Sequence, residues 1–143
     1  MDRFEGQCLC GAVRFAITPP SLFCVHCHCR FCRAAHGAGF VTWVGAHDDR
    51  FAYLAGRDLV HWYQSSPQSR RGFCSVCGTT MFYVSTLSPG EVHVARALIS
   101  GDIDRTPQAH VFFDHRPPWI QCSDDLPKID SSSPRLEKYK AVK

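Results

Sequence analysis

Four cysteines and two histidines lie within nine residues, in the order Cys24-Val25-His26-Cys27-His28-Cys29-Arg30-Phe31-Cys32. Soft side chains that deprotonate and lie this close together bind a metal, form a disulfide or take part in redox chemistry. Thiolates from Cys27, Cys29 and Cys32 can converge on one metal ion and leave its fourth position open, as in catalytic zinc sites. Cys24 could instead close the site by pairing with Cys27. A closed site would be structural, whereas an open one would do chemistry.

A second cysteine pattern is the run Cys74-Ser75-Val76-Cys77-Gly78. A C-x-x-C turn followed by glycine is typical of a zinc knuckle, because two thiolates point the same way and glycine relieves the tight turn. One knuckle supplies two of the four ligands that a structural zinc needs. The run Cys8-Leu9-Cys10-Gly11 offers the missing pair. We therefore assign Cys8, Cys10, Cys74 and Cys77 to a closed structural zinc site.

A thiol/disulfide redox protein is an alternative interpretation of the cluster at positions 24–32. The C-x-x-C spacing occurs there twice, at 24–27 and at 29–32. Without a metal, cysteines at this spacing form disulfides readily. The cluster would then be a redox switch.

The composition is that of one globular domain: 143 residues, with 45% hydrophobic and 20% charged residues. The formal net charge of +3 is carried entirely by the last ten residues, so residues 1–133 are neutral. A nucleic-acid binder usually has a basic stripe on its folded part, so this distribution argues against one. We expect a single zinc domain over residues 1–130 and a basic, flexible tail over 131–143, which begins with the run Ser131-Ser132-Ser133-Pro134.

The start of the chain lacks the apolar run of a signal peptide, and no apolar segment could cross a bilayer. Nine cysteines could indicate a disulfide-rich secreted protein, but the number is odd. We therefore expect a cytoplasmic protein whose cysteines are held by metal, with no membrane partner.

The elements that must position these cysteines are short and mostly strands. Alternating or β-branched composition predicts strands over 7–17, 40–44, 51–55, 59–64, 80–85, 91–98 and 110–114. The run Gly56-Arg57-Asp58 predicts a hairpin between the third and fourth of these strands. A short helix is expected over 30–36, closed by Gly37. The sequence therefore predicts a mainly β domain with little helix.

Three motifs carry a family resemblance. They are Gly6-Gln7-Cys8-Leu9-Cys10-Gly11-Ala12-Val13, then Cys27-His28-Cys29-Arg30-Phe31-Cys32-Arg33, then Gly72-Phe73-Cys74-Ser75-Val76-Cys77-Gly78. Together with the distal Pro118-Trp119 and Asp125-Leu126-Pro127, the chain over 5–128 resembles the glutathione-dependent formaldehyde-activating enzyme family, which also contains centromere protein V.

The resemblance implies a β-tent fold of several small coiled antiparallel sheets around a structural zinc. It places that zinc on Cys8, Cys10, Cys74 and Cys77, and a second, catalytic zinc on the residues Cys27, Cys29 and Cys32. Cys24 lies outside the motif. We interpret Cys24 and Cys122 as small buried apolar side chains.

The reaction that the resemblance implies is that of a carbon–sulfur lyase, in which glutathione and formaldehyde form S-hydroxymethylglutathione. The small-molecule thiol would bind at the open position of the three-cysteine zinc. Glutathione has two carboxylates, so basic groups are needed, and Arg33, Arg70 and Arg71 are the candidates. His26 and His28 could shuttle protons, although alternation points His28 away from the metal.

A non-catalytic interaction domain stabilised by zinc, like the centromere-protein branch of the family, is the remaining alternative. In that case the basic tail would be the contact element. Its shortness and the neutral body count against this function.

Overall fold

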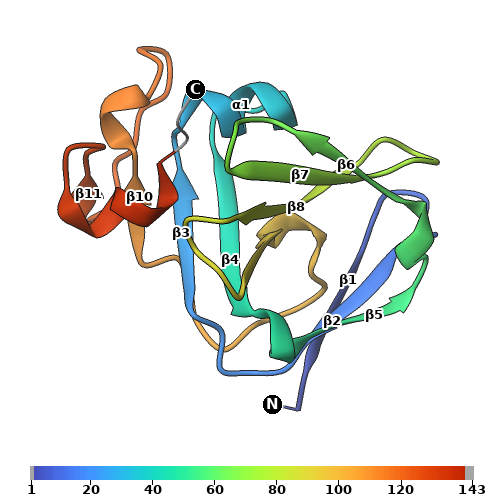
Figure 1. Cartoon of the computed structure of the whole chain (residues 1–143). Helices are drawn as coiled ribbons and strands as arrows, with labels where there is room; N and C mark the ends of the chain where they lie inside the picture. The colour runs from blue at the N-terminus through green and yellow to red at the C-terminus, as the bar shows by residue number, and fades with distance from the viewer. Residues whose placement is uncertain (1, 141–143) are drawn as a thin grey trace.

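The computed structural model describes residues 2–140, which form two β-sheets and one short α-helix (Figure 1). The small sheet has three antiparallel strands in the order β1 (Phe4–Gln7), β2 (Arg14–Ile17) and β5 (Phe51–Ala55). The large sheet has eight strands in the order β11-β10-β3-β4-β9-β8-β7-β6. The mainly β fold predicted from the sequence is therefore confirmed.

The strands of the large sheet are β3 (Phe23–Cys27), β4 (Val41–His47), β6 (Val60–Gln64), β7 (Ser69–Cys74), β8 (Thr80–Ser85), β9 (Glu91–Ala95), β10 (Ala109–Val111) and β11 (Lys128–Ile129). Short 3-10 helices in the described part are η1 (Asp48–Arg50), η2 (Arg57–Leu59), η3 (Arg96–Leu98), η4 (Phe113–His115) and η5 (Pro134–Tyr139). None of the helices over residues 2–140 has the length and apolar character needed to cross a membrane.

The helix α1 (Arg30–His36) has the bounds expected from the sequence. It ends because Gly37 adopts a left-handed backbone with a φ of 61°, which glycine reaches without strain. Cys29 is the N-cap residue at the other end of α1, and its side chain makes no capping hydrogen bond. The second cysteine cluster therefore runs from the end of a strand directly into a helix.

Strand β3 lies between β4 and β10, and its pairing with β10 is parallel. The register places Val111 opposite Cys27 and His110 opposite His26. Successive side chains of a strand point to opposite faces. Phe23, Val25 and Cys27 accordingly face one side of the sheet.

The apolar side chains form two clusters. The first lies around Phe15 and Phe82, whose ring centroids are 5.5 Å apart, and joins the small sheet to the large one. The second lies around Trp43, Tyr83 and Leu136, and it includes the cysteines of the second cluster. Complete burial of a large apolar side chain stabilises a fold by about 1.5–3 kcal/mol.

The prediction of a single strand over 7–17 is wrong, because a tight turn separates β1, which ends at Gln7, from β2, which begins at Arg14. The backbone N–H of Cys8 donates to the carbonyl of Val13, and Gly11 adopts a φ of 78°. This turn carries Cys8 and Cys10. The hydrogen bond across the turn and the positive φ of Gly11, rather than the alternation of the flanking residues, decide the local structure.

The hairpin expected over 51–64 is also wrong. Strand β5 pairs with β2 in the small sheet, whereas β6 pairs with β7 in the large one. Gly56 makes this crossing possible, because a Cβ atom there would lie 2.1 Å from the carbonyl oxygen of Ala12. The backbone at position 56 passes so close to the turn that carries Cys8 and Cys10 that only a residue without a Cβ atom fits there.

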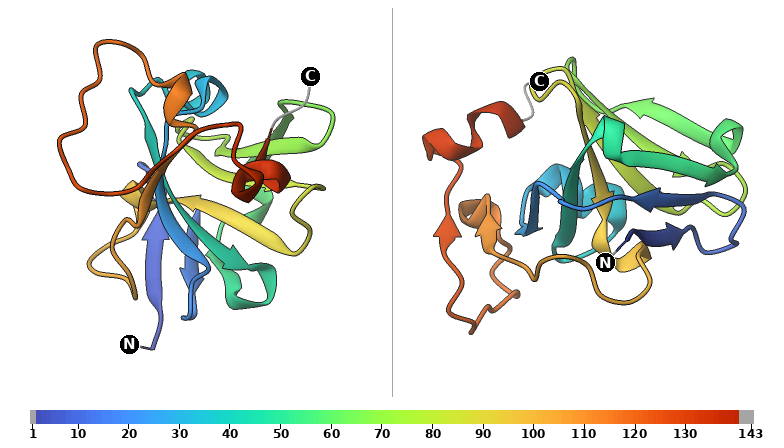
Figure 2. Two further views of the ribbon diagram at one scale, coloured as in Figure 1. Left: turned by 90° about the vertical axis from the view of Figure 1, so that its left-hand side faces the viewer. Right: turned by 90° about the horizontal axis from the view of Figure 1, so that it is seen from below.

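The segment expected to be a flexible tail packs against the domain as far as the structure describes it. Helix η5 is capped by Ser133, and Leu136 is buried with 5% of its surface exposed. Figure 2 shows this C-terminal segment, in red, as a short helix that follows β11. The difference arises because Leu136 and Tyr139 supply an apolar face within a charged sequence. Residues 141–143 lie outside the described part.

Candidate metal centres and the adjoining pocket

The first metal centre joins two turns that are far apart in the sequence. The sulfur atoms of Cys8, Cys10, Cys74 and Cys77 lie within 4.8 Å of one another. The sulfurs of Cys8 and Cys10 are 3.6 Å apart, and those of Cys10 and Cys74 are 3.9 Å apart. Zinc–sulfur bonds of about 2.3 Å in a tetrahedron require sulfurs about 3.8 Å apart. The four cysteines assigned from the sequence therefore fit a zinc ion.

Thr79 ties the two turns together at this centre. Its hydroxyl accepts a hydrogen bond from the backbone N–H of Leu9 at 3.1 Å and lies 3.1 Å from the sulfur of Cys77. Hydrogen bonds from the side chain and backbone of Thr79 lower the pKa of the Cys77 thiol to about 5. The thiolate, which is the form that binds metal, is thereby favoured.

The second centre consists of Cys27 at the end of β3, Cys29 at the start of α1 and Cys32 in its first turn. Their ligand atoms also lie within 4.8 Å of one another, and the sulfurs of Cys27 and Cys32 are 3.6 Å apart. Hydrogen bonds from Cys27 and Cys29, with the charge of Arg71, hold the pKa of the Cys32 thiol well below its ordinary value. Three converging sulfurs fit zinc and leave one position for another ligand.

Cys24 cannot close this second centre, because it lies on the other face of β3. Positions 24 and 27 differ by an odd number, and Cys24 is fully buried in the first apolar cluster. Cys27 belongs to the second cluster. The alternation of the strand thus separates Cys24 from the group of Cys27, Cys29 and Cys32, which the spacing alone leaves undecided.

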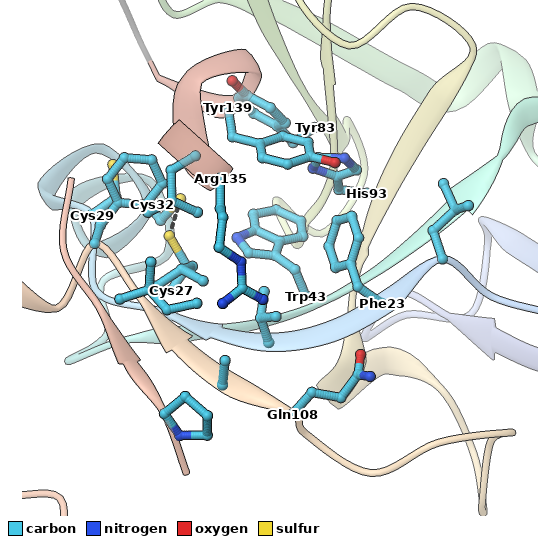
Figure 3. Close-up of a pocket in the computed structure, with 18 of the residues that line it drawn as sticks. Phe23, Cys27, Cys29, Cys32, Trp43, Tyr83, His93, Gln108, Arg135 and Tyr139 are labelled. Atoms are coloured by element: carbon cyan, nitrogen blue, oxygen red, sulfur yellow. Dashed lines mark hydrogen bonds between the residues drawn. The ribbon is translucent and has the colours of Figure 1, made fainter. Parts of the chain in front are cut away.

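A cavity of about 360 Å³ adjoins the second centre. Figure 3 shows Cys27, Cys29 and Cys32 on one side of it and Phe23 on the other. Most of its walls are apolar or aromatic, including Trp43 and Tyr83. An open coordination position at this centre would therefore have access to a pocket large enough for a small molecule.

Arg71 is the only one of the three predicted arginines that lines this cavity. It is 6% exposed, its Nη2 atom donates to the sulfur of Cys32 at 3.6 Å, and its guanidinium lies over the ring of Tyr83. Its Nε and Nη1 atoms have no hydrogen-bond partner within residues 2–140. A buried cation of this kind is suited to an anionic ligand.

The other two predicted arginines lie elsewhere. Arg33 donates from Nε to the carbonyl of His28 and from Nη2 to that of His115, so it holds two backbone segments together. Arg70 points to the opposite face of β7 and covers the ring of Trp62. Arg135, which reaches the cavity from η5, was not among the arginines predicted from the sequence. Its distance along the chain from the cysteine motifs gave no indication of this contact.

Glu91 fastens η5 over the cavity. Its carboxylate accepts hydrogen bonds from Lys138 at 2.9 Å and from the Tyr139 hydroxyl at 3.2 Å, and lies 3.0 Å from Nε2 of His93. Burial opposes ionisation, but the hydrogen bonds from His93 and Lys138 outweigh it and lower the pKa of Glu91 to about 2. One wall of the pocket is thus held by a buried carboxylate.

His26 and His28 do not line the cavity. Nδ1 of His26 lies 2.8 Å from the hydroxyl of Thr42, and Nε2 of His28 lies 2.8 Å from Nδ1 of His110. Both rings are on the face of β3 opposite Cys27, as alternation predicts for His28. A proton shuttle to a ligand in the pocket finds no support here.

The comparisons with known proteins agree on one family. A family model described as glutathione-dependent formaldehyde-activating enzyme matches residues 3–115. A Halomonas elongata protein named as a glutathione-dependent formaldehyde-activating enzyme is 28% identical over 124 residues, which cover 82% of this chain and 79% of that protein. A Schizosaccharomyces pombe protein named as an uncharacterized lyase is 30% identical over 119 residues, which cover 82% of this chain and 83% of that protein.

The crystal structure of a Rhodobacter sphaeroides protein is similar to this fold, with a TM-score of 0.58 and 26% identity. The match covers 70% of this chain and 91% of that one. The stretch matched by the family model contains all seven cysteines of the two thiolate centres. The chain belongs to the glutathione-dependent formaldehyde-activating enzyme family.

Proposed function

We propose that this protein is a zinc-dependent carbon–sulfur lyase that acts on the adduct of a small thiol, with glutathione and formaldehyde as the family's reactants. The observation that carries the proposal is the placement of Cys27, Cys29 and Cys32 beside the cavity, with no fourth cysteine or histidine from residues 2–140 in their group. Zinc at Cys8, Cys10, Cys74 and Cys77 is proposed to be structural, because four protein ligands leave no open position.

The reaction needs an ionised thiol next to a carbonyl carbon. A thiol with a pKa of about 8.5 is mostly protonated at neutral pH. A zinc ion held by Cys27, Cys29 and Cys32 would supply the missing ionisation, since a coordinating thiol is deprotonated. In the adduct-forming direction the sulfur bonds to the carbon of formaldehyde, the electron pair of the C=O bond moves to oxygen, and oxygen takes the proton that the thiol lost.

The chain's own residues bind and orient the substrate. Three thiolates exceed the charge of a divalent ion by one negative charge, and Arg71 beside Cys32 offsets it. Its unpartnered donors suit a substrate carboxylate. Arg135 from η5 adds a second positive charge to the lining. The aromatic walls exclude water, which strengthens these electrostatic interactions.

The test is the metal content and activity of Cys29→Ser beside wild-type protein. We expect the variant to fold, to hold one zinc fewer and to lose catalysis of exchange between glutathione and its formaldehyde adduct, measured by NMR. The matched control is Cys24→Ala, which removes a cysteine on the other face of β3 and should retain both properties. A Cys29→Ser protein with wild-type zinc content, or with wild-type exchange, would refute the proposal.

A second candidate function, thiol/disulfide exchange, is favoured by one distance. The sulfurs of Cys27 and Cys32 are 3.6 Å apart, and the low pKa of Cys32 makes it the more reactive thiol. Mass spectrometry after mild oxidation, on folded protein whose second centre is empty, decides between the two functions. Loss of two hydrogen atoms to the oxidant that is reversed by thioredoxin, and is blocked by bound zinc, would support a redox role for the empty site.

A further inference from the structure

A third group of metal-binding side chains lies on the face of the large sheet opposite the pocket. His28, His110 and Cys122 each offer a ligand atom, and these atoms lie within 4.8 Å of one another. His28 follows β3, His110 lies in β10, and Cys122 belongs to the long loop between η4 and β11. The parallel pairing of β3 and β10 (Figure 1) brings the two histidines together across a separation of 82 residues.

His110 is oriented as a metal ligand would be. Its Nε2 atom lies 2.8 Å and 3.0 Å from the two carboxylate oxygens of Asp124, so the proton of the ring is held on Nε2. The lone pair is then on Nδ1, which points at Nε2 of His28. Metal-binding histidines usually donate their other N–H to a carboxylate in this way, which fixes the tautomer and raises the basicity of the ligand.

His28 can present a second lone pair to the same point. Its Nε2 atom lies 2.8 Å from Nδ1 of His110, so without a metal it carries the ring proton and donates it to that lone pair; the ring is fully buried. Its Nδ1 atom has no hydrogen-bond partner within residues 2–140, so no neighbour requires a lone pair there. When a metal ion displaces the proton from Nε2 to Nδ1, both Nε2 of His28 and Nδ1 of His110 are available to that ion.

Cys122 supplies the third donor. It is half-buried, and no hydrogen bond to another described residue fixes its thiol. Bonds of about 2.0–2.1 Å to nitrogen and 2.3 Å to sulfur place tetrahedral ligand atoms roughly 3.3–3.6 Å apart. The nitrogens of the two histidines, which are 2.8 Å apart, must therefore separate by about half an ångström when they bind one ion.

We propose that His28, His110 and Cys122 form a third metal site, which takes a borderline divalent ion such as zinc and keeps its fourth position open to solvent beside Cys122. Two imidazoles and one thiolate are the donor types that zinc and cobalt(II) accept, and hard ions such as magnesium do not. The site shares no ligand with the two thiolate centres. It lies on the opposite face of β3 from Cys27, so it can fill independently of the pocket.

The experiment is a titration of folded, reduced full-length protein with cobalt(II), followed in the visible and near-ultraviolet absorption, with the zinc already bound counted by elemental analysis. We expect a total of three metal equivalents on wild-type protein and two on Cys122→Ser. Asp124→Asn should weaken binding of the third ion by about tenfold to a hundredfold, because the carboxylate no longer orients His110. Cys24→Ala, which also removes one cysteine, should bind three equivalents, and Cys29→Ser should lose the pocket centre while keeping this one.

Two results would overturn the proposal. One is saturation of wild-type protein at two equivalents. The other is a titration of Cys122→Ser and Asp124→Asn that is indistinguishable from wild type. In either case Asp124, His110 and His28 would form a hydrogen-bonded chain and nothing more. Cys122 and Asp124 lie in a loop and contribute little to the core, so both variants should remain folded, which circular dichroism checks.

Discussion

The Nη2 atom of Arg71 lies 3.6 Å from the sulfur of Cys32, and no carboxylate within residues 2–140 forms an ion pair with this buried cation. An unpaired cation inside a protein costs free energy unless an anion accompanies it. Here the available anion is the thiolate of Cys32, whose pKa is held well below its ordinary value by hydrogen bonds from Cys27 and Cys29. Arg71 therefore connects the charge of the metal centre with the charge of whatever occupies the pocket.

Replacing Arg71 by methionine should weaken binding of a carboxylate-bearing thiol by roughly tenfold to a hundredfold, the effect of a lost charged hydrogen bond. Arg70→Met is the matched control, since Arg70 is the next residue of the same strand and faces Trp62. Calorimetric titration with glutathione measures both. Equal affinities for the two variants would show that Arg71 does not contact the ligand.

Cys74→Ser should destroy the first centre and leave the protein insoluble. Structural zinc contributes about 10–16 kcal/mol of apparent binding free energy in small zinc modules. This is comparable to the whole stability of a domain, about 5–15 kcal/mol. Soluble expression and thermal unfolding are the measurements. A soluble Cys74→Ser protein with an unchanged melting temperature would contradict a structural role for this zinc.

Gly56→Ala should destabilise the protein much more than Gly90→Ala. Both glycines have a positive φ, 75° and 77°, so each substitution carries a backbone cost of roughly 1–2 kcal/mol. A Cβ atom at Gly56 would also meet the carbonyl of Ala12, whereas one at Gly90 meets nothing within 4 Å. Urea unfolding of both variants gives the difference, and equal losses would mean that the close approach is not required.

The attachment of η5 should weaken as the pH falls. Glu91 has an ordinary pKa of 4.5, which the folded protein lowers to about 2. A lowered pKa means that the carboxylate stabilises the fold above pH 4.5 and that this contribution is lost progressively between pH 4.5 and 2. Hydrogen exchange of the η5 amides, corrected for the intrinsic exchange rate at each pH, should show less protection in wild-type protein as the pH falls below 4.5. Glu91→Gln should already be less protected at pH 7 and should show a smaller change with pH.

Leu136→Ala tests the pocket wall without touching the metal centres. Leu136 is 5% exposed and packs in the second apolar cluster. Its truncation should cost about 2–5 kcal/mol where the packing cannot relax. We expect the loss to appear as local release of η5, with weaker ligand binding and unchanged zinc content. Global unfolding at a markedly lower temperature would show instead that η5 is part of the cooperative core.

The cysteines that converge in the two candidate centres could be predicted from the sequence, apart from the position of Cys24, because each group carries a local signal. A glycine after each cysteine pair and a helix beginning at Arg30 are signals a few residues long. The face of β7 on which Arg71 lies could not be predicted from such local signals. Neighbouring residues of a strand face opposite sides, and the pairing of β7 with β8 contains a bulge between Gly72 and Phe73. Only the observed register shows that Arg71, and not Arg70, lines the cavity.

Contacts between distant segments were equally hidden. The meeting of His28 with His110 depends on a parallel pairing across 82 residues. The separation of β5 from β6 into two sheets depends on the close approach at Gly56. Helix η5 has a sequence rich in charge, and only the buried neighbours of Leu136 and Tyr139 make it part of the fold.

The origin of the pocket wall bears on how such proteins diverge. The stretch that matches the family model ends at residue 115, whereas Arg135, Leu136 and Tyr139 belong to η5, beyond it. One wall of the pocket thus lies beyond the matched stretch, whereas the three cysteines and most of the lining lie within it. If the pocket binds the substrate, substitutions in η5 would change which molecules are accepted and leave the cysteines unchanged. A shared family name would then persist among proteins that have acquired different substrates.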